Sequence, residues 1–582
     1  MIDYRSLDSA IGHDWYELDP ALQGEVRRGC PPEDLEWVDA RLHDLGTLVG
    51  GPVARNAEII DANPPQLVRY DKWANEVNEV AHHPAALESK GLLWRAGYVS
   101  GFAADEKKHG RPAPAVLHGA SSYLLSEADT GMVCSLGMTS GVAGLVAAYA
   151  PADVRDDLLS GLRADDLDTG VDGSMFLTER DGGSDLGRSV HCSATDIGDG
   201  RVLISGEKWF CSNIDGAAIV MLARPEGAPD GPQGLGLYLV PRRLDDGSLN
   251  HYSMRRLKPK LGTKSVPTGE VEFHEALGYA LRPRKERDGG GSPTSDAGGL
   301  GRMMEMVNGS RFGVAMMGMG IARRCLLESA IWAHHREAKG RLLVDLPLVR
   351  EQLVDLATEV EAALAFGFAC STAARLEDGI RLRRILVPAA KVRLCRLGVE
   401  AASATIELYG GNGYCEDWGL TRQLRDAQCH PIWEGSENIC AIDVLRAIRR
   451  DSAHEAVFTL LDAIGQRAAA LPSYATAAVE AVARGRRELD RRIDALAGLE
   501  PDAAEAKAGQ LTELLVRTVS TALLLDQAVT DGDHRKALLA VRSARRHLDA
   551  GSRWDDGIAQ SAGREILAFD QVDEATATQA AA

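Results

Sequence analysis

The segment "PIWEGSENI", residues 431–439, places Glu434 between a tryptophan and a glycine. A carboxylate beside large apolar groups loses contact with water when it is buried, and burial favours its protonated form. The pKa of such a glutamate rises toward neutrality, which suits a general base that works near pH 7. Glu434 therefore has the most suggestive setting of any candidate acid or base in this sequence.

Two earlier stretches combine glycine or aromatic residues with hydroxyl groups. In "MFLTERDGGSDLG" (175–187) a short apolar run leads into a glycine-rich turn that carries Thr178 and Ser184. Glycines let backbone N–H groups approach a ligand closely, although a purely structural loop is the alternative. In "GEKWFCSN" (206–213) Trp209 and Phe210 face opposite sides of a strand, so one could cover a flat ligand or both could be core.

A glycine turn follows in "ELYGGNGYCEDWGLTRQLRDA" (407–427). Its glycines could simply cap a helix, and Arg425 and Asp426 could simply pair with each other. His334 and His335 are adjacent, so they point in different directions on a helix and predict no metal site. The sequence contains no G-x-S-x-G, H-E-x-x-H or Walker pattern.

Charge and cysteine content restrict the class of protein. The 582 residues carry a formal charge of −19, which disfavours general nucleic-acid binding. Basic runs occur at 484–492 and 534–547, but residues 451–582 hold 15 Lys and Arg against 21 Asp and Glu, so charged helix faces are favoured. The ten cysteines form no C-x-x-C pair, which indicates a reducing compartment.

The sequence also predicts a protein that is not embedded in a membrane. The first twenty residues do not resemble a signal peptide, and the apolar stretch 141–152 is too short to span a bilayer. We therefore expect a cytoplasmic protein.

The texture of the chain changes twice. Residues 1–168 predict a mostly helical N-terminal domain, including 69–89, whereas 169–282 contain short strand-like runs that predict a β domain. Residues 283–299 are charged and then rich in glycine and serine, which predicts a flexible linker or insertion. A helical domain is expected over 300–450, where Leu353, Val360 and Leu364 share one apolar stripe, and an additional helical segment over 451–582.

Taken in order, "FLTERDGGSD", "GEKWFCSN", "VNGSRFG", "LYGGNGY", "LRDA" and "IWEGSENI" resemble the acyl-CoA dehydrogenase family. The text at 208–212, 410–416 and 432–439 is similar to its AidB-like branch. The resemblance implies an α+β multidomain fold with a helical N-terminal domain, a central β-sandwich, a C-terminal helical bundle and an extra C-terminal helical segment. It also implies a homotetramer in which the glycine turn of one subunit touches the FAD of its neighbour.

The resemblance assigns site residues by position. Glu434 matches the catalytic base, and Ser184, Arg311 and Gly435 match substrate-binding positions. The positions that match contacts to non-covalent FAD are Leu177, Thr178, Gly183, Ser184, Phe210, Ser212, Arg336, Glu407, Gly410, Gly411, Ser436 and Asn438. Phe210 stands where the family usually has tryptophan over the isoalloxazine ring, and Ser212 where a hydroxyl reaches flavin N5.

The implied reaction is FAD-dependent α,β-dehydrogenation of an acyl-CoA or a related acyl thioester, with an electron-transfer flavoprotein as acceptor. A flavin-dependent oxidase or N-oxygenase is one alternative, although those relatives replace the glutamate base that is retained here. A DNA-protection protein like AidB is another, and the net acidic C-terminal segment counts against it.

The chain departs from the family pattern at three places. Lys339 stands where the family has an aromatic residue against adenine, Pro347 replaces a common glutamine, and 288–299 is similar to no family segment and is interpreted as an insertion. Some members carry the base on the helix of Arg311; the neighbouring position here is Ser310, which cannot act as a base and so favours Glu434.

Overall fold

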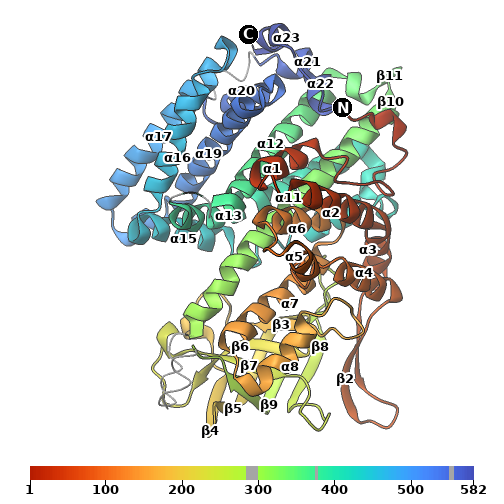
Figure 1. The fold of residues 1–582 in the computed structure, drawn as a ribbon, viewed down its shortest axis with the longest axis vertical. Helices are drawn as coiled ribbons and strands as arrows, with labels where there is room; N and C mark the ends of the chain where they lie inside the picture. Colours follow the sequence, from red (N-terminus) through yellow and green to blue (C-terminus); the bar gives the residue numbers. More distant parts are fainter. Residues whose placement is uncertain (284–298, 374–375, 377, 550–555, 582) are drawn as a thin grey trace. The chain divides into compact units, whose positions relative to one another are not determined.

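The structure is a computed structural model that describes residues 1–283, 299–373, 376, 378–549 and 556–581 (Figure 1). The chain divides into two compact units. One, the helical unit, comprises Met1–Gly51, Pro114–Ala128 and Arg311–Ala582, and the other, the sheet unit, comprises Pro52–Ala113 and Asp129–Ser310. The segment predicted as a linker or insertion lies, except for its ends, outside the described residues.

The helical unit is built from helices and one small hairpin. Its elements are α1 (Pro20–Gly29), α2 (Leu35–Leu48), α6 (Ala115–Ala128), the part of α11 (Gly299–His335) from Arg311 on, β10 (Glu337–Ala338), β11 (Arg341–Leu342), α12 (Pro347–Thr372), α13 (Gly379–Tyr409), α14 (Leu420–Ala427), α15 (Glu437–Asp451), α16 (His454–Ala468), α17 (Thr476–Ala497), α18 (Pro501–Glu505), α19 (Ala508–Asp531), α20 (His534–His547), α21 (Ile558–Ser561), α22 (Gly563–Leu567) and α23 (Glu574–Ala581). The apolar stripe predicted on α12 is confirmed, since Leu353, Val360 and Leu364 are all buried.

The sheet unit contains a seven-stranded mixed sheet with helices around it. Its elements are α3 (Ala54–Ala62), β1 (Gln66–Tyr70), β2 (Glu76–Ala81), α4 (Pro84–Arg95), α5 (Ala103–His109), α7 (Thr130–Tyr149), α8 (Ala152–Leu162), β3 (Gly173–Phe176), α9 (Leu186–Ser189), β4 (Ser193–Gly198), β5 (Arg201–Ser212), β6 (Ala218–Pro225), β7 (Gly236–Pro241), β8 (Tyr252–Leu257), β9 (Thr268–Ala280) and the start of α11. Strand β6 pairs with both β4 and β7, so the pairing β6-β4-β5-β9-β7 returns to β6 and closes a ring.

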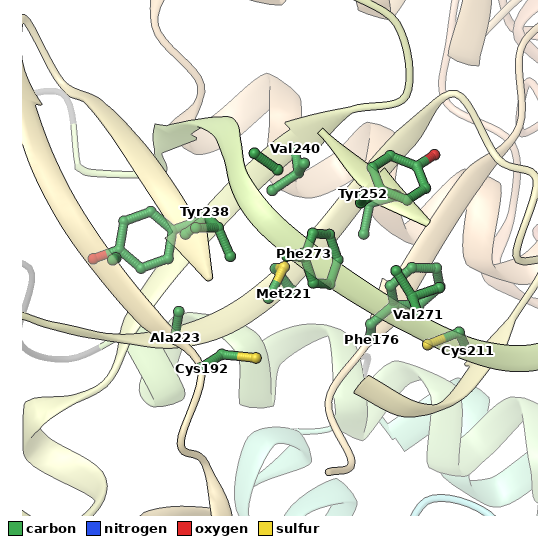
Figure 2. Close-up of a cluster of buried hydrophobic side chains, with 14 of the residues drawn as sticks. Phe176, Cys192, Cys211, Met221, Ala223, Tyr238, Val240, Tyr252, Val271 and Phe273 are labelled. Atoms are coloured by element: carbon green, nitrogen blue, oxygen red, sulfur yellow. The ribbon is translucent and has the colours of Figure 1, made fainter. Parts of the chain in front are cut away.

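The ring of strands encloses an apolar core (Figure 2). Alternate residues of each strand point inward, as the two-residue period of a strand requires. Phe176, Met221, Tyr238, Val271 and Phe273 contribute large side chains to this core. The expected fold class is confirmed: a helical N-terminal part, a central β domain and C-terminal helices follow one another along the chain.

The prediction that residues 69–89 are helical is wrong for their first half. Strands β1 and β2 pair antiparallel there, with Gln66 opposite Ala81 and Val68 opposite Glu79. The Asp71 carboxylate accepts hydrogen bonds from the backbone N–H of Trp73 (2.8 Å) and of Asn75 (2.9 Å), which closes the turn between the strands. Local side-chain hydrogen bonds of this kind compete with a helix, and the β-branched Val68, Val77 and Val80 on the two sides of the turn favour strands.

One described helix, α7, is long and apolar enough to cross a membrane by length and composition. Most of it is nevertheless buried inside the fold: 61% of its most apolar window is covered. A Cβ added at Gly173 of β3 would come within 2.7 Å of Val142 on α7, so the helix packs directly against this strand. Such burial is typical of a core helix.

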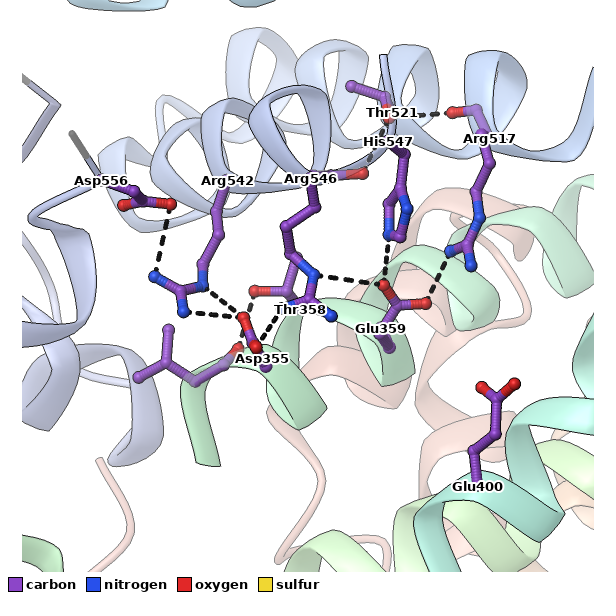
Figure 3. Close-up of polar contacts among 12 residues, drawn as sticks. Asp355, Thr358, Glu359, Glu400, Arg517, Thr521, Arg542, Arg546, His547 and Asp556 are labelled. Carbon is purple, nitrogen blue, oxygen red and sulfur yellow. Dashed lines mark hydrogen bonds and ion pairs between the residues drawn. The ribbon is translucent and has the colours of Figure 1, made fainter. Parts of the chain in front are cut away.

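Carboxylates of α12 attach the C-terminal helices through buried ion pairs (Figure 3). Glu359 Oε2 lies 2.6 Å from Arg517 Nη1 of α19 and 2.9 Å from Arg393 Nη2 of α13. The His547 ring on α20 hydrogen-bonds the other oxygen of Glu359. Burial alone raises the pKa of Glu359, but the His547 hydrogen bond and the charge of Arg517 outweigh it and hold that pKa well below its usual range.

The basic run 534–547, which is α20, is engaged inside the unit rather than spread over a solvated face as predicted. Arg535 Nη1 lies 3.1 Å from Glu361 Oε2, and Lys536 Nζ lies 2.6 Å from the same carboxylate. Arg542 Nη2 lies 2.7 Å from Asp355 Oδ1. Much of the positive charge of this helix is therefore neutralised by α12, which leaves less of it for an external anion.

Candidate functional site

Glu434 lies in the turn between α14 and α15. The backbone N–H groups of Ile432 and Trp433 both donate to the Cys429 carbonyl at 3.0 Å. Glu434 then takes a left-handed conformation with φ of 56°, and Gly435 follows with φ of 105°. Side chains rarely adopt a left-handed backbone, and such residues gather at functional sites, where the surroundings hold them.

The environment of the Glu434 carboxyl matches the prediction of a raised pKa. The side chain is half-buried, and this loss of water raises the pKa of Glu434 to about 7, although the charges of Arg311 and Lys391 act in the opposite direction. A carboxyl with this pKa is part ionised at neutral pH and can accept a proton there. The geometry thus supports the assignment of Glu434 as an acid or base.

Arg311 contacts the main chain of this turn. Its Nε donates to the Glu434 carbonyl oxygen at 3.0 Å, and its Nη1 lies 2.7 Å from Asp443 Oδ2 on α15. Arg384 Nη2 of α13 also donates to Asp443, at 2.9 Å. The structure therefore brings Arg311 together with Glu434 and Gly435, as the family pattern implies, but through the backbone of the base residue.

Lys391 and His430 are neighbours of the turn that the sequence did not identify. The Lys391 ammonium on α13 donates to the carbonyl of Pro431 at 2.9 Å and to that of Gly435. His430 is fully buried, and burial together with the charge of Lys391 lowers the pKa of its ring to about 3. A single lysine within the apolar part of α13 was the only sign of this contact in the sequence. Its partners Pro431 and Gly435 lie about forty residues later in the chain, so the sequence did not identify them.

The predicted turn 177–184 of the sheet unit runs beside strand β5. The Leu177 carbonyl accepts from Lys208 Nζ at 3.2 Å, and the Thr178 carbonyl accepts from the Trp209 N–H at 2.8 Å. A Cβ added at Gly183 would come within 2.5 Å of Thr178 Oγ1, so a larger residue there would force the Thr178 side chain to shift. Ser184 next to it is exposed. The turn therefore offers a glycine cradle with a hydroxyl at its edge.

Strand β5 presents an exposed aromatic ring. Phe210 is 53% exposed and Trp209 is half-buried, and the pairing of β5 shifts register between Lys208 and Cys211, so the regular alternation predicted for these two rings is interrupted. The Lys258 ammonium lies 3.7 Å from the centre of the Trp209 ring and 4.8 Å from that of Phe210, which fixes both rings. Ser212 Oγ lies 3.0 Å from Thr268 Oγ1. An exposed flat ring beside a hydroxyl fits the isoalloxazine of FAD.

In the helical unit, the residues predicted to contact the rest of FAD are open to solvent. Arg336, directly after α11, is exposed, and no described carboxylate lies within ion-pair distance of it. Gly410 ends α13 with φ of 64°, and the space where side chains of Gly410 and Gly411 would stand is open. Glu407 is exposed on the last turn of the same helix. A guanidinium without an acidic partner fits a pyrophosphate.

Two further predicted contacts lie at the start of α15. Ser436 caps this helix, and its hydroxyl accepts from the Ile439 N–H at 3.5 Å, while Asn438 is exposed in the first turn. A helix N-terminus of this kind favours polar and anionic groups.

The two departures that the structure describes both lie in the helical unit. Lys339 has a left-handed φ of 54° in the turn between β10 and β11, and Pro347 begins α12. Neither lysine nor proline there supplies an aromatic face. Arg425 pairs with Glu416, and Asp426 pairs with Arg422.

No group of three or more His, Cys, Asp and Glu that could hold a metal ion occurs among the residues that the structure describes. His334 instead engages its own helix, where its Nδ1 lies 2.7 Å from the Ala330 carbonyl. All ten cysteines lie among the described residues, and none of them forms a disulfide.

Comparison with known families gives three matches in chain order. Residues 8–169 match the adaptive response protein AidB N-terminal domain, residues 174–276 the acyl-CoA dehydrogenase middle domain, and residues 297–449 the acyl-CoA dehydrogenase C-terminal domain. These three segments contain every residue assigned to the site.

Individual relatives agree with these matches. The putative acyl-CoA dehydrogenase AidB of Escherichia coli is 31% identical over 452 residues, which are 75% of this chain and 78% of that protein. Acyl-CoA dehydrogenase family member 11 of Caenorhabditis elegans is 28% identical over 75% of this chain and 70% of its own.

Solved structures share the fold. The crystal structure of C. elegans ACDH-11 in complex with C11-CoA superposes with a TM-score of 0.84 at 24% identity and covers 94% of this chain and 93% of that one. An acyl-CoA dehydrogenase complexed with FAD from Bacillus anthracis gives a TM-score of 0.70 at 13% identity, with 96% and 93% of the two chains covered. With the three domain matches and the E. coli relative, these findings show that this chain belongs to the acyl-CoA dehydrogenase family, in its AidB-like branch, and is an FAD-dependent enzyme.

Proposed function

We propose that this enzyme catalyses α,β-dehydrogenation of an acyl-CoA or a related acyl thioester, with Glu434 as the base. The observation that carries this proposal is the half-buried Glu434 carboxyl, whose pKa lies at about 7 on a turn held by Arg311 and Lys391. The α C–H bond breaks, its proton passes to a Glu434 carboxylate oxygen, and its electron pair forms the new double bond as a hydride leaves Cβ. FAD, when bound, supplies the hydride acceptor at N5.

The backbone of the base residue is suited to stabilise the enolate oxygen. The Glu434 N–H has no hydrogen-bond acceptor among the described residues, while its carbonyl is held by Arg311. An N–H group fixed in this way can donate to the thioester oxygen as negative charge develops on it, and such donors are worth most where water is excluded. Trp433, which is half-buried and precedes Glu434 in the chain, would help to exclude water from the carboxyl.

Binding of FAD falls to residues with different chemistry. Leu177, Thr178, Gly183 and Ser184 form a turn for the flavin's pyrimidine edge and phosphate, Phe210 a face for the ring, and Ser212 a hydroxyl for N5. Arg336 supplies positive charge for the pyrophosphate. The further proposed contacts to FAD are Glu407, Gly410, Gly411, Ser436 and Asn438. We further propose a homotetramer in which the glycine turn serves the neighbouring subunit's FAD, and an electron-transfer flavoprotein as acceptor.

Acyl-CoAs are expected to bleach the bound flavin in the absence of oxygen. Because the C. elegans relative was crystallised with C11-CoA, the panel should include that chain length beside shorter, longer and branched acyl groups. At least one member should remove the flavin absorbance near 450 nm, a wavelength typical of oxidised flavins, at about one equivalent, because dehydrogenation transfers two electrons. The measurement is an anaerobic absorbance titration.

The anaerobic titration tests dehydrogenation, and a turnover assay in air separates a dehydrogenase from an oxidase. If dithionite reduces the flavin but no acyl-CoA does, dehydrogenation is contradicted. If turnover consumes oxygen and releases peroxide at the rate of substrate loss, the enzyme is an oxidase relative. Transfer of the electrons to an electron-transfer flavoprotein, with little peroxide, supports a dehydrogenase.

Replacing Arg336 by alanine is expected to lower the FAD content several-fold without weakening the fold. The side chain is exposed and has no described acidic partner, so its loss should change stability by less than about 0.5 kcal/mol. The measurement is flavin absorbance per polypeptide after gel filtration, with Arg341→Ala on the facing strand of the same hairpin as control. An Arg336→Ala protein with full FAD content would exclude the pyrophosphate role.

A further inference from the structure

Lys391 is a buried cation without an acidic partner. Its side chain on α13 is completely covered, and no described carboxylate lies within ion-pair distance of its ammonium. Removing an ammonium from water is costly unless its charge and its three N–H donors are used. Other buried lysines of this chain are paired: Lys208 contacts Glu179 at 2.7 Å and Lys536 contacts Glu361 at 2.6 Å. The position of Lys391 therefore calls for another explanation.

The Lys391 ammonium donates its hydrogen bonds to the turn that carries Glu434. It donates to the carbonyl oxygens of Pro431 and Gly435, which bracket Glu434 in the chain. Arg311 holds the carbonyl of Glu434 itself from α11. Two left-handed residues in succession are strained for a chain that is not all glycine, so they persist only where neighbouring groups fix them. Lys391 supplies two of these three fixed points.

The same ammonium contributes the charge that faces the base. The charged and titratable groups around Glu434 are Arg311 on α11, Lys391 on α13, Cys440 and Asp443 on α15, and His430 in the preceding turn. Burial raises the pKa of Glu434, and Arg311 and then Lys391 oppose that rise. Asp443 is occupied by Arg311 and Arg384, and His430, whose ring pKa is about 3, is neutral, so Lys391 is the positive group next to the base without a carboxylate of its own.

We propose that Lys391 is a positioning residue for the catalytic base: it ties the turn at Pro431 and Gly435 so that Glu434 faces the substrate, and its positive charge favours the carboxylate form of Glu434. This inference rests on the proposed role of Glu434. It makes two separable statements, one about geometry, which limits turnover at every pH, and one about charge, which sets the pH at which the enzyme becomes active.

Two substitutions separate geometry from charge. In Lys391→Met both are lost, so the acid limb of the pH profile of kcat/KM should move up by about one unit or more, and the plateau kcat should fall about tenfold or more. In Lys391→Arg the charge stays but the planar guanidinium cannot reproduce both contacts. Its acid limb should stay within about 0.3 unit of wild type while its plateau kcat falls, a rough limit that reflects preserved charge.

A matched control tests whether any loss of activity in the Lys391 variants comes only from lower stability of the fold. Lys536→Met also deletes a buried ammonium of the helical unit, but that ammonium binds Glu361 on α12 rather than the Glu434 turn. It is expected to lower the thermal midpoint while leaving the pH profile unchanged. FAD content is measured for every variant, and turnover is expressed per bound flavin.

The outcomes are distinct. A Lys391→Met enzyme whose acid limb and plateau kcat coincide with wild type overturns the inference. If Lys391→Met does not fold, Lys391→Arg decides: a tenfold loss of kcat with FAD retained supports it, and wild-type turnover overturns it. Glu434→Gln distinguishes this failure from failure of the proposed function, because turnover in that variant removes the base assignment itself, whereas an inactive Glu434→Gln beside unaffected Lys391 variants removes only the role of Lys391.

Discussion

Glu434→Gln is expected to lower turnover on the order of 10³-fold, because general bases contribute about 10²- to 10⁴-fold and an amide cannot accept the α-proton. The substitution keeps the size of the side chain and leaves the backbone contacts of Arg311 and Lys391 in place. FAD binding and folding should therefore persist. The measurement is kcat/KM with the acyl-CoA that bleaches the flavin, expressed per bound FAD. A variant that retains more than about a tenth of wild-type turnover contradicts the assignment.

The same variant is expected to be more stable than wild type at pH 8. The pKa of Glu434 is about 7 in the folded protein and has its unperturbed value of 4.5 in the unfolded chain, so folding favours the protonated carboxyl. Its contribution to stability is present below about pH 4.5 and lost as the pH rises through 7, which costs up to about 3 kcal/mol. Glutamine avoids this cost. Loss of activity without loss of thermal stability thus excludes unfolding as its cause, and Glu437→Gln, three residues on and paired with Arg396, is the control.

Glu359→Leu is expected to destabilise the helical unit by about 3–5 kcal/mol, because it leaves buried positive groups without their counter-charge. Arg517 and Arg393 both rely on this carboxylate, and so does the His547 ring. The matched control is Glu400→Leu: Glu400 contacts the same Arg393 at 2.7 Å but is 50% exposed, so its loss should cost less than about 1 kcal/mol. Thermal unfolding followed by helix content compares the two. Equal midpoints would show that the cluster contributes little.

Acid should weaken a second buried ion cluster on α12, formed by Glu361 with Arg535 and Lys536. The pKa of Glu361 is lowered to about 2: burial raises it, but the charges of Arg535 and Lys536 outweigh that effect. A carboxylate with a depressed folded pKa contributes stability that is full above its usual value of 4.5 and is lost as the pH falls toward 2. This one group accounts for roughly 3 kcal/mol over that window.

The proposed base could be located from the sequence because its local neighbours carry the information. Trp433 and Gly435 adjoin Glu434, so the sequence alone predicts a carboxyl shielded from water beside an accessible backbone N–H. Lys391 and Asp443 could not be found in this way. Their contacts with the turn depend on how α11, α13 and α15 pack, and residues far apart in sequence meet there.

The errors of the sequence interpretation also have physical causes. Residues 69–81 have weak apolar spacing, and their hairpin is fixed by Asp71, whose side chain replaces backbone partners of a helix. The basic residues of 534–547 were expected on a solvated helix face, because composition does not show which carboxylates a basic side chain contacts in the fold. Arg535 and Arg542 instead meet carboxylates of α12, more than 170 positions earlier in the chain.

The closed ring of the sheet unit has a consequence for handling the protein without its cofactor. Strands β4, β5, β6, β7 and β9 each pair with a neighbour on both sides, although only two residue pairs join β4 to β6 and two join β7 to β9, so these strands offer only short rows of unpaired N–H and C=O groups. Unpaired rows of that kind are what allow one chain to add strands to another and form aggregates. Removing FAD breaks none of these strand pairings, so the apoprotein is expected to resist strand-mediated aggregation and to be recoverable by adding the cofactor back.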